Sequence, residues 1–195
     1  FQEAGSFILT VSYPLEEVIF WKGRYYLESS EKEKALTFFK QVSYPEAFEF
    51  LAQIYQSMGK LDEALANYEI LESRFSHYNP SKILNHIIAL LETLEQPEKL
   101  LIYLEKAEKF FPYKTDLKIK KGKTLYLLKK IQESYDILSS PSLPKKDKEI
   151  LTILAHSAFE LKKYEESITY FDLLLNLSFD EKRKKVFAFM QTFHF

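Results

Sequence analysis

The chain has 195 residues, the size of one ordinary domain or one short repeat array, so it has no room for a second large catalytic domain. Hydrophobic residues make up 46% of the chain and charged residues 28%, which is enough apolar material for a core and too much for a disordered tail. Only 4 Gly and 7 Pro occur, so Gly-rich phosphate loops are almost excluded and the composition favours helices.

The charge is small overall but unevenly distributed. The formal net charge is -1, which gives no global basic field of the kind that drives nonspecific nucleic-acid binding. Residues 1–97 carry 8 Lys or Arg against 14 Asp or Glu, a net charge of -6, whereas residues 98–195 carry 19 against 14, a net charge of +5. We therefore expect an electrically bipolar molecule.

Several classes of site and segment are excluded by residues that the chain lacks. There is no cysteine, which rules out disulfides, thiolate metal sites and cysteine nucleophiles. No uncharged apolar run approaches the roughly 18 residues of a membrane-spanning helix, so we expect no transmembrane segment. Because the chain starts at Phe1 without Met, we interpret it as a piece of a longer protein. An upstream anchor and the cellular compartment both stay open.

The strongest signal is an internal repeat. Its clearest unit begins at Phe48 and reads FEFLAQIYQSMGKLDEALANYEIL, two helical apolar patterns separated by a break at Gly59-Lys60. Two antiparallel helices follow from this pattern. They can pack closely because Ala52 on the first helix and Ala64 on the second are both small, and Tyr68 fills the space one turn later.

The spacing from Ala52 to Ala64 recurs five times along the chain. We call the two positions of each copy a crossing pair. The crossing pairs are Gly23 with Ala35, Ala52 with Ala64, Ile88 with Leu100, Gly122 with Ser134, and Ala155 with Ser167. A large apolar residue stands four positions after each second member: Phe39, Tyr68, Leu104, Leu138 and Phe171. The step from the first copy to the second is the shortest, which leaves open whether the second helix of the first copy has full length.

This pattern resembles the tetratricopeptide repeat family, whose unit is a helix-turn-helix of about 34 residues. The signature positions of the second copy hold Phe48, Leu51, Ala52, Tyr55, Gly59, Ala64 and Tyr68, and those of the fifth hold Leu151, Leu154, Ala155, Tyr164, Ser167 and Phe171. The resemblance covers about residues 16–181. It implies an all-α fold, a right-handed superhelical solenoid of about five antiparallel helix pairs with a C-terminal extra helix.

Proline-containing breaks and the repeat phase divide the chain into segments. We expect an N-terminal lead segment at 1–15, then helix pairs at about 16–44, 45–79, 81–113, 115–144 and 148–180. In the remaining residues, 182–195, apolar side chains predominate from Val186 onward. Residues 182–195 form either a capping helix or the start of a truncated sixth repeat.

Motifs that suggest catalysis are better explained by the repeat. Gly122-Lys123-Thr124 spells the end of a phosphate loop, but Leu117 stands where that loop needs glycine. The four histidines are scattered over different copies, and carboxylate pairs such as Asp62-Glu63 lie in first turns of helices, where they offset the helix dipole. We therefore expect no enzyme activity, no catalytic residues, no cofactor and no metal.

The resemblance implies a non-catalytic adaptor or scaffold. In this family the first helix of each pair forms a concave wall, which we expect to bind an extended or helical segment of a partner protein. By repeat phase, the candidate binding residues on this wall are Arg24, Glu49, Gln53, Gln56, Asn85, Glu92, Lys123, Tyr126, His156 and Phe159.

Two other functions stay open. The chain could be a self-assembling structural subunit, a possible homo-oligomer joined through its apolar C-terminal helix and its bipolar charge. Nucleic-acid binding through the Lys-rich C-terminal half is the less favoured alternative, because only three arginines occur and no aromatic platform is interleaved with the lysines. The identity and pathway of a partner do not follow from the sequence.

Overall fold

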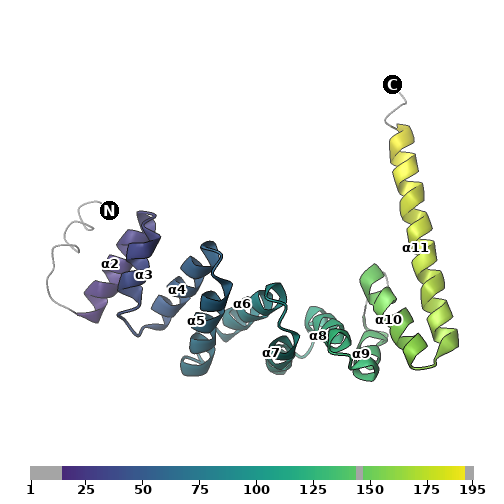
Figure 1. Ribbon diagram of the computed structural model, residues 1–195, viewed down its shortest axis with the longest axis horizontal. Coiled ribbons are helices and arrows are strands. Elements are labelled where there is room, and N and C mark those ends of the chain that lie inside the picture. Colours follow the sequence, from purple (N-terminus) through teal and green to yellow (C-terminus); the bar gives the residue numbers. More distant parts are fainter. Residues whose placement is uncertain (1–14, 144–146, 192–195) are drawn as a thin grey trace. The chain divides into compact units, whose positions relative to one another are not determined.

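The computed structural model describes residues 15–143 and 147–191, with side chains described up to residue 179. Within these residues it has ten helices and no strand, and α2 with α3, α4 with α5, α8 with α9 and α10 with α11 pack as pairs (Figure 1). The predicted all-α fold of paired helices is confirmed. The chain divides into two compact units, residues 1–96 and 97–195, called unit 1 and unit 2 below. Because Pro97 carries no charge, the counts given above apply to these units, whose net charges are -6 and +5.

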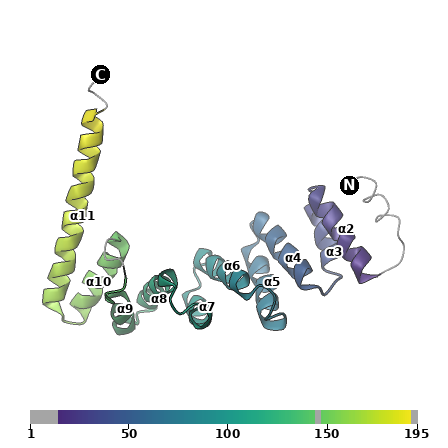
Figure 2. The ribbon, with the colours of Figure 1, turned by 180° about the vertical axis from the view of Figure 1, so that it is seen from behind.

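Unit 1 contains five of the described helices: α2 (Glu16–Glu28), α3 (Lys32–Phe39), α4 (Pro45–Ser57), α5 (Leu61–Arg74) and α6 (Pro80–Thr93). Helices α4 and α6 each begin with proline, whose missing N–H would have no partner in a first turn. The second helix of the first copy is short, since α3 has 8 residues and α5 has 14. Figures 1 and 2 show α4 and α5 side by side from opposite directions.

Unit 2 contains α7 (Pro97–Phe110), α8 (Thr115–Leu127), α9 (Ile131–Leu138), α10 (Lys148–Glu160) and α11 (Tyr164–Gln191). The carboxylate of Asp147 caps α10 by accepting hydrogen bonds from the backbone N–H groups of Glu149 and Ile150. The boundary between the units falls after Gln96. It therefore separates α6 from α7, the two helices of the expected pair 81–113.

The C-terminal segment differs from the expected arrangement. Helix α11 has 28 residues and continues without a break past residue 181. No glycine or proline occurs after Pro144, so the sequence contains no signal that would end this helix. Residues 182–191, expected as a capping helix or as the start of a sixth repeat, thus continue the second helix of the fifth copy. Residues 192–195 and most of the lead segment 1–15 lie outside the described residues.

The turns between paired helices repeat one backbone feature in phase. Residues with positive φ occur at Ser30, Gly59, Glu95, Lys129 and Lys162, each seven positions after the first member of its crossing pair. Only one of them is glycine, which adopts this left-handed conformation without steric cost. The turn geometry is therefore set by the repeat as a whole and not by a glycine in each copy.

Close helix crossings explain the small residues of the repeat. A Cβ atom added to Gly122 would lie 2.5 Å from the Leu138 side chain, and one added to Gly23 would lie 2.9 Å from the Phe39 ring. In the second copy, Ala52 and Ala64 are both completely buried. A larger side chain at these positions would push the two helices apart.

Two of the copies add a hydrogen bond at the same crossing. The Ser134 hydroxyl donates to the carbonyl oxygen of Gly122 at 2.8 Å, and the Ser167 hydroxyl donates to that of Ala155 at 2.9 Å. Each bond joins the second member of a crossing pair to the first, in copies four and five. The serines replace alanine at little cost because each buried hydroxyl is paired.

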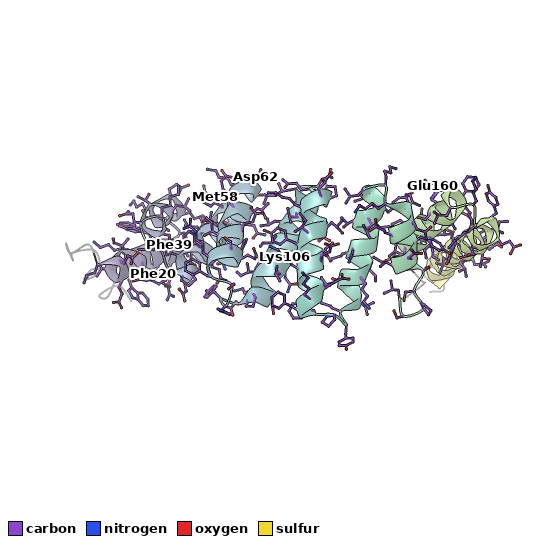
Figure 3. All side chains as sticks on the ribbon, turned by 90° about the horizontal axis from the view of Figure 1, so that it is seen from below. Phe20, Phe39, Met58, Asp62, Lys106 and Glu160 are labelled. Atoms are coloured by element: carbon purple, nitrogen blue, oxygen red, sulfur yellow. The ribbon has the colours of Figure 1, made fainter. Side chains whose placement is uncertain are left out.

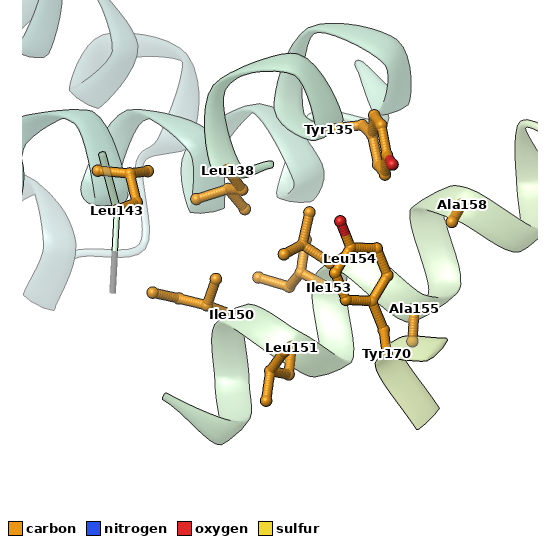
Figure 4. Packing of buried hydrophobic residues seen from close by; sticks show 10 residues of the cluster. All are labelled: Tyr135, Leu138, Leu143, Ile150, Leu151, Ile153, Leu154, Ala155, Ala158 and Tyr170. Atoms are coloured by element: carbon orange, nitrogen blue, oxygen red, sulfur yellow. The ribbon is translucent and has the colours of Figure 1, made fainter. Parts of the chain in front are cut away.

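The large residue that stands four positions after the second member of a crossing pair is covered by the first helix of the next pair. Phe39 of α3 stacks on Phe50 of α4 with ring centroids 5.1 Å apart, and Figure 3 shows Phe39 beside Phe20 of α2. Tyr68 of α5 stacks on His86 of α6 at 4.8 Å. In unit 2, Leu138 is buried in a cluster with apolar residues of α10 (Figure 4). Each of these helix pairs thus depends on the next pair along the chain to bury the side of its second helix that carries this large residue.

The close crossing predicts that Gly122→Ala destabilises the fold by about 1–3 kcal/mol, because the added methyl group overlaps Leu138. Urea unfolding of the two proteins measures the difference. The control is the same substitution in a Leu138→Ala background, where space for the methyl group exists and the additional loss should be small. An equal loss in both backgrounds would contradict this explanation.

Candidate protein-binding surface

The candidate binding residues all lie on the first helices of their pairs. We call the exposed sides of α2, α4 and α6 in unit 1, and of α8 and α10 in unit 2, the first-helix wall of each unit. Unit 1 holds Arg24, Glu49, Gln53, Gln56, Asn85 and Glu92; unit 2 holds Lys123, Tyr126, His156 and Phe159. The two walls are described separately below.

In unit 1, Arg24 connects α2 to α4. Its guanidinium carbon lies 4.9 Å from the centroid of the Trp21 ring and 5.9 Å from that of Phe50, within the range of cation–π attraction. A guanidinium nitrogen also lies 3.4 Å from the Glu28 carboxylate. Arg24 is therefore engaged in holding neighbouring repeats together.

Glu49 is the centre of a hydrogen-bonded network that connects α4 to α6. Its side chain is predicted as a wall residue, but the residue is only 7% exposed. The carboxylate accepts hydrogen bonds from the Tyr78 hydroxyl at 2.6 Å and from the Lys82 ammonium at 2.5 Å. The Gln53 amide donates a third at 3.2 Å. The buried charge is thus compensated by three donors.

The network keeps Glu49 ionised. Burial alone raises the pKa of this carboxyl, but the hydrogen bonds from Lys82 and Tyr78 together outweigh it, and the pKa lies below its usual value of 4.5. Burial, with the nearby Glu49 charge, raises the pKa of Tyr68 to about 12. Burial and the positive charge of Lys82 lower the pKa of His86. At neutral pH the network therefore holds one fixed carboxylate facing Lys82.

The Glu49 partners were not identified in the sequence. Tyr78 precedes α6 and Lys82 lies in its first turn, 29 and 33 positions after Glu49. Both separations are close to the length of one repeat. A basic residue about one repeat after Glu49 was therefore the sequence signal that could have predicted this contact.

The remaining predicted wall residues of unit 1 are exposed. Gln56 and Asn85 lie on the helical turns that follow the Glu49–Lys82 contact, and Glu92 lies near the end of α6.

The wall of unit 2 has its own connection between first helices. The Lys123 ammonium on α8 donates to the Glu149 carboxylate on α10 at 2.5 Å. Tyr126, also on α8, is half-buried against the cluster shown in Figure 4, and the Lys129 ammonium lies 5.9 Å from its ring centroid. Lys123 therefore has a role between the repeats, like Arg24 and Glu49.

The aromatic residues of α10 are exposed and lie near α11. The His156 ring meets Phe171 edge to face with centroids 5.7 Å apart, and the Phe159 ring meets Tyr164 at 5.8 Å. Phe159 is 60% exposed. These two wall residues therefore lie at the border between the wall of unit 2 and the surface of α11.

Other kinds of site find no support in the described residues. They contain no group of three or more His, Asp or Glu side chains that could hold a metal ion. None of the described helices combines the length and the apolar character required to cross a membrane. A hollow of about 320 Å³ follows α5, but it is lined by the consecutive residues 74–78 of a single turn and not by separate elements.

Comparison with known proteins identifies the repeat. A family model described as tetratricopeptide repeat matches residues 45–69 and 149–181, which contain the crossing pairs of copies two and five. These two segments are similar to tetratricopeptide repeats. The predicted resemblance to this family is therefore confirmed. No curated protein matches the chain at a significant level.

Solved structures of tetratricopeptide-repeat proteins share the fold at low sequence identity. A mutant form of MamA is 16% identical with a TM-score of 0.62, over 84% of this chain and 92% of that one. YrrB, described as a TPR protein with an unusual peptide-binding site, is 16% identical with a TM-score of 0.59, over 82% and 84%. PilF of Pseudomonas aeruginosa is 18% identical with a TM-score of 0.50, over 83% and 75%. At these identities the likeness shows the fold alone.

We expect Glu49→Gln to lower the free energy of unfolding at pH 7 by about 1–2 kcal/mol, because the charge-assisted hydrogen bonds weaken. Since folding lowers the pKa of Glu49, its contribution is present in full above about pH 4.5 and is lost as the pH falls below that value. Urea unfolding at pH 7 and at about pH 3 should therefore show a difference that narrows in acid.

The matched control for Glu49→Gln is Glu31→Gln, which removes an exposed ion pair with Lys34 at 2.5 Å. Exposed pairs of this kind contribute little, so this variant should unfold like the wild type at pH 7. A loss for Glu49→Gln that is the same at both pH values would show that its charge is not the stabilising feature.

Proposed function

We propose that the chain is a non-catalytic adaptor that binds an extended or helical segment of a partner protein on its first-helix walls. The observation that carries this proposal is the row of exposed amides in unit 1, beside the Glu49 network. Gln53 and Gln56 on α4 and Asn85 on α6 are all exposed, while Glu49 and Lys82 tie the two helices together beneath them. These amides present donors and acceptors on a fixed frame.

An amide-rich wall suits the backbone of a peptide. Each Gln or Asn side chain offers both a donor and an acceptor, which is what the alternating N–H and C=O groups of an extended segment require. Because the frame is already hydrogen-bonded, little conformational entropy is lost there on binding. The peptide-binding site named in the description of YrrB, which has the same fold, is consistent with this use.

The wall of unit 2 offers a different chemistry. Tyr126, His156 and Phe159 present aromatic surface on α8 and α10, and aromatic side chains often supply most of the binding energy at interfaces. Unit 2 also has the net positive charge. We infer that its partner segment carries apolar or aromatic anchors and acidic residues, while the wall of unit 1 selects mainly for backbone and polar groups.

The proposal predicts that the triple variant Gln53→Ala, Gln56→Ala and Asn85→Ala loses peptide affinity by roughly tenfold or more, since several peptide hydrogen bonds disappear. Peptides selected from a random displayed library on the wild-type chain, then titrated calorimetrically, provide the measurement. The control is Gln132→Ala on α9, a second helix, which should leave affinity unchanged.

Selected peptides that bind the triple variant as tightly as the wild type would place the binding site elsewhere and would overturn the assignment. Failure to select any peptide on the chain would do the same. Nucleic acid included in the same titrations is expected to show no binding at physiological salt, since the net charge is -1.

A further inference from the structure

The outer side of α11 carries a row of apolar side chains at helical spacing. Tyr164, Ile168, Phe171, Leu175 and Phe179 are all exposed, and we call these five residues the α11 stripe. The other apolar side of the same helix packs against α10, where Tyr170 is buried and Leu174 and Leu177 contact the core cluster. Helix α11 is thus apolar on two adjacent sides, and only one of them is covered.

The repeat itself shows that the α11 stripe corresponds to a buried surface. Its residues Ile168 and Phe171 stand one and four positions after Ser167, the second member of the fifth crossing pair. The same two positions are 3% and 0% exposed in the second copy, at Leu65 and Tyr68. In α11 they are 61% and 43% exposed. In the second copy a first helix of the next pair covers them, and α11 has no such successor in the described residues.

The border of the stripe indicates the charge of its missing partner. Glu165 and Asp172 are exposed on α11 and lie beside the stripe by helical spacing, and Glu160 is exposed at the end of α10. A helix that covers the stripe should therefore combine an apolar face with basic residues. Residues 182–191 of the same helix have that composition, since they read KRKKVFAFMQ.

Residues 182–191 cannot reach the stripe of their own helix, because α11 continues straight past α10 (Figure 1). A second copy of the chain can supply them. In an antiparallel pairing of two α11 helices about a two-fold axis near residue 178, residues 181–191 of each copy lie against residues 165–175 of the other. Asp172, on the border of each stripe, then stands opposite residue 184, within the basic run 182–185 of the partner copy.

We propose that the chain forms a symmetric dimer through antiparallel packing of its α11 helices, with the α11 stripe of each copy covered by the other. The available area is adequate. The five stripe residues and Phe159 are between 43% and 61% exposed. At roughly 200 Å² for each such side chain, about 600 Å² per copy becomes buried, close to the lower limit for a stable interface.

Sedimentation velocity of the 195-residue chain over a hundredfold concentration range tests the proposal. The wild type should shift from monomer to dimer, and Ile168→Glu should raise the dimer dissociation constant at least tenfold, because two charged carboxylates then replace apolar side chains in the buried interface. The matched control is Ile102→Glu on α7, an isoleucine that is 55% exposed and outside the stripe. It should dimerise like the wild type.

The antiparallel register has its own test. The chain has no cysteine, so Ser178→Cys places a single thiol near the proposed axis, and mild oxidation should join two copies through it. Tyr113→Cys, at a residue that is 93% exposed before α8, should remain unjoined. Asp172→Lys should weaken the dimer, and adding Lys184→Glu, at the position that faces residue 172 in this register, should restore it.

A chain that stays monomeric at every concentration would overturn the proposal, as would a dimer that Ile168→Glu leaves intact. A monomer whose stripe instead binds a basic amphipathic peptide of unrelated sequence would also overturn it, in favour of a foreign helical partner. The result is separable from peptide binding on the wall of unit 1, because neither Ile168 nor Phe159 belongs to that wall and the Ile168→Glu chain should still bind the peptides that depend on Gln53, Gln56 and Asn85.

Discussion

The close crossing of the two helices in each pair is the constraint on which the rest of the structure depends. At Gly122 the approach leaves no room even for a Cβ atom, because Leu138 occupies that space. The large residue four positions after the second member of the crossing pair, Leu138 in this copy, packs against the first helix of its own pair and also contacts the next pair. It is buried only if a further helix covers it, as Phe50 covers Phe39 and His86 covers Tyr68. Close packing within a pair therefore requires a neighbouring pair.

The helices that cover these faces also form the candidate binding walls. Some wall side chains hold successive first helices together: Glu49 accepts from Lys82, and Lys123 donates to Glu149. Others, such as Gln56 and Asn85, are exposed and take no part in those contacts. The fold thus separates residues that stabilise the frame from residues that a ligand can reach, although both kinds occupy equivalent positions of the repeat. Among the described residues the outer side of α11 has no covering helix, which links the fold to the proposed dimer.

The sequence predicts the fold well because the residues that mark each helix crossing recur in several copies of the repeat. A crossing pair and a large residue four positions later mark each copy, and Pro45 and Pro80 mark helix starts. The continuous α11 was missed because no glycine or proline after Pro144 marks where the second helix of the fifth copy would end. The burial of Glu49 was missed because its partners, Tyr78 and Lys82, belong to the next copy. The position of a residue within its repeat predicts whether it lies on a first-helix wall, but whether it is exposed depends on the side chains around it.

Amide hydrogen exchange measured at two protein concentrations tests most directly the claim that each pair must be covered by another helix. Helix α5, packed against α4 and α6, should exchange slowly at both concentrations. Residues 164–179 of α11 should exchange faster than α5 in dilute protein and should slow markedly when the concentration is raised. Exchange in α11 that is as slow as in α5 and independent of concentration would show that its outer face needs no cover, and would contradict the account.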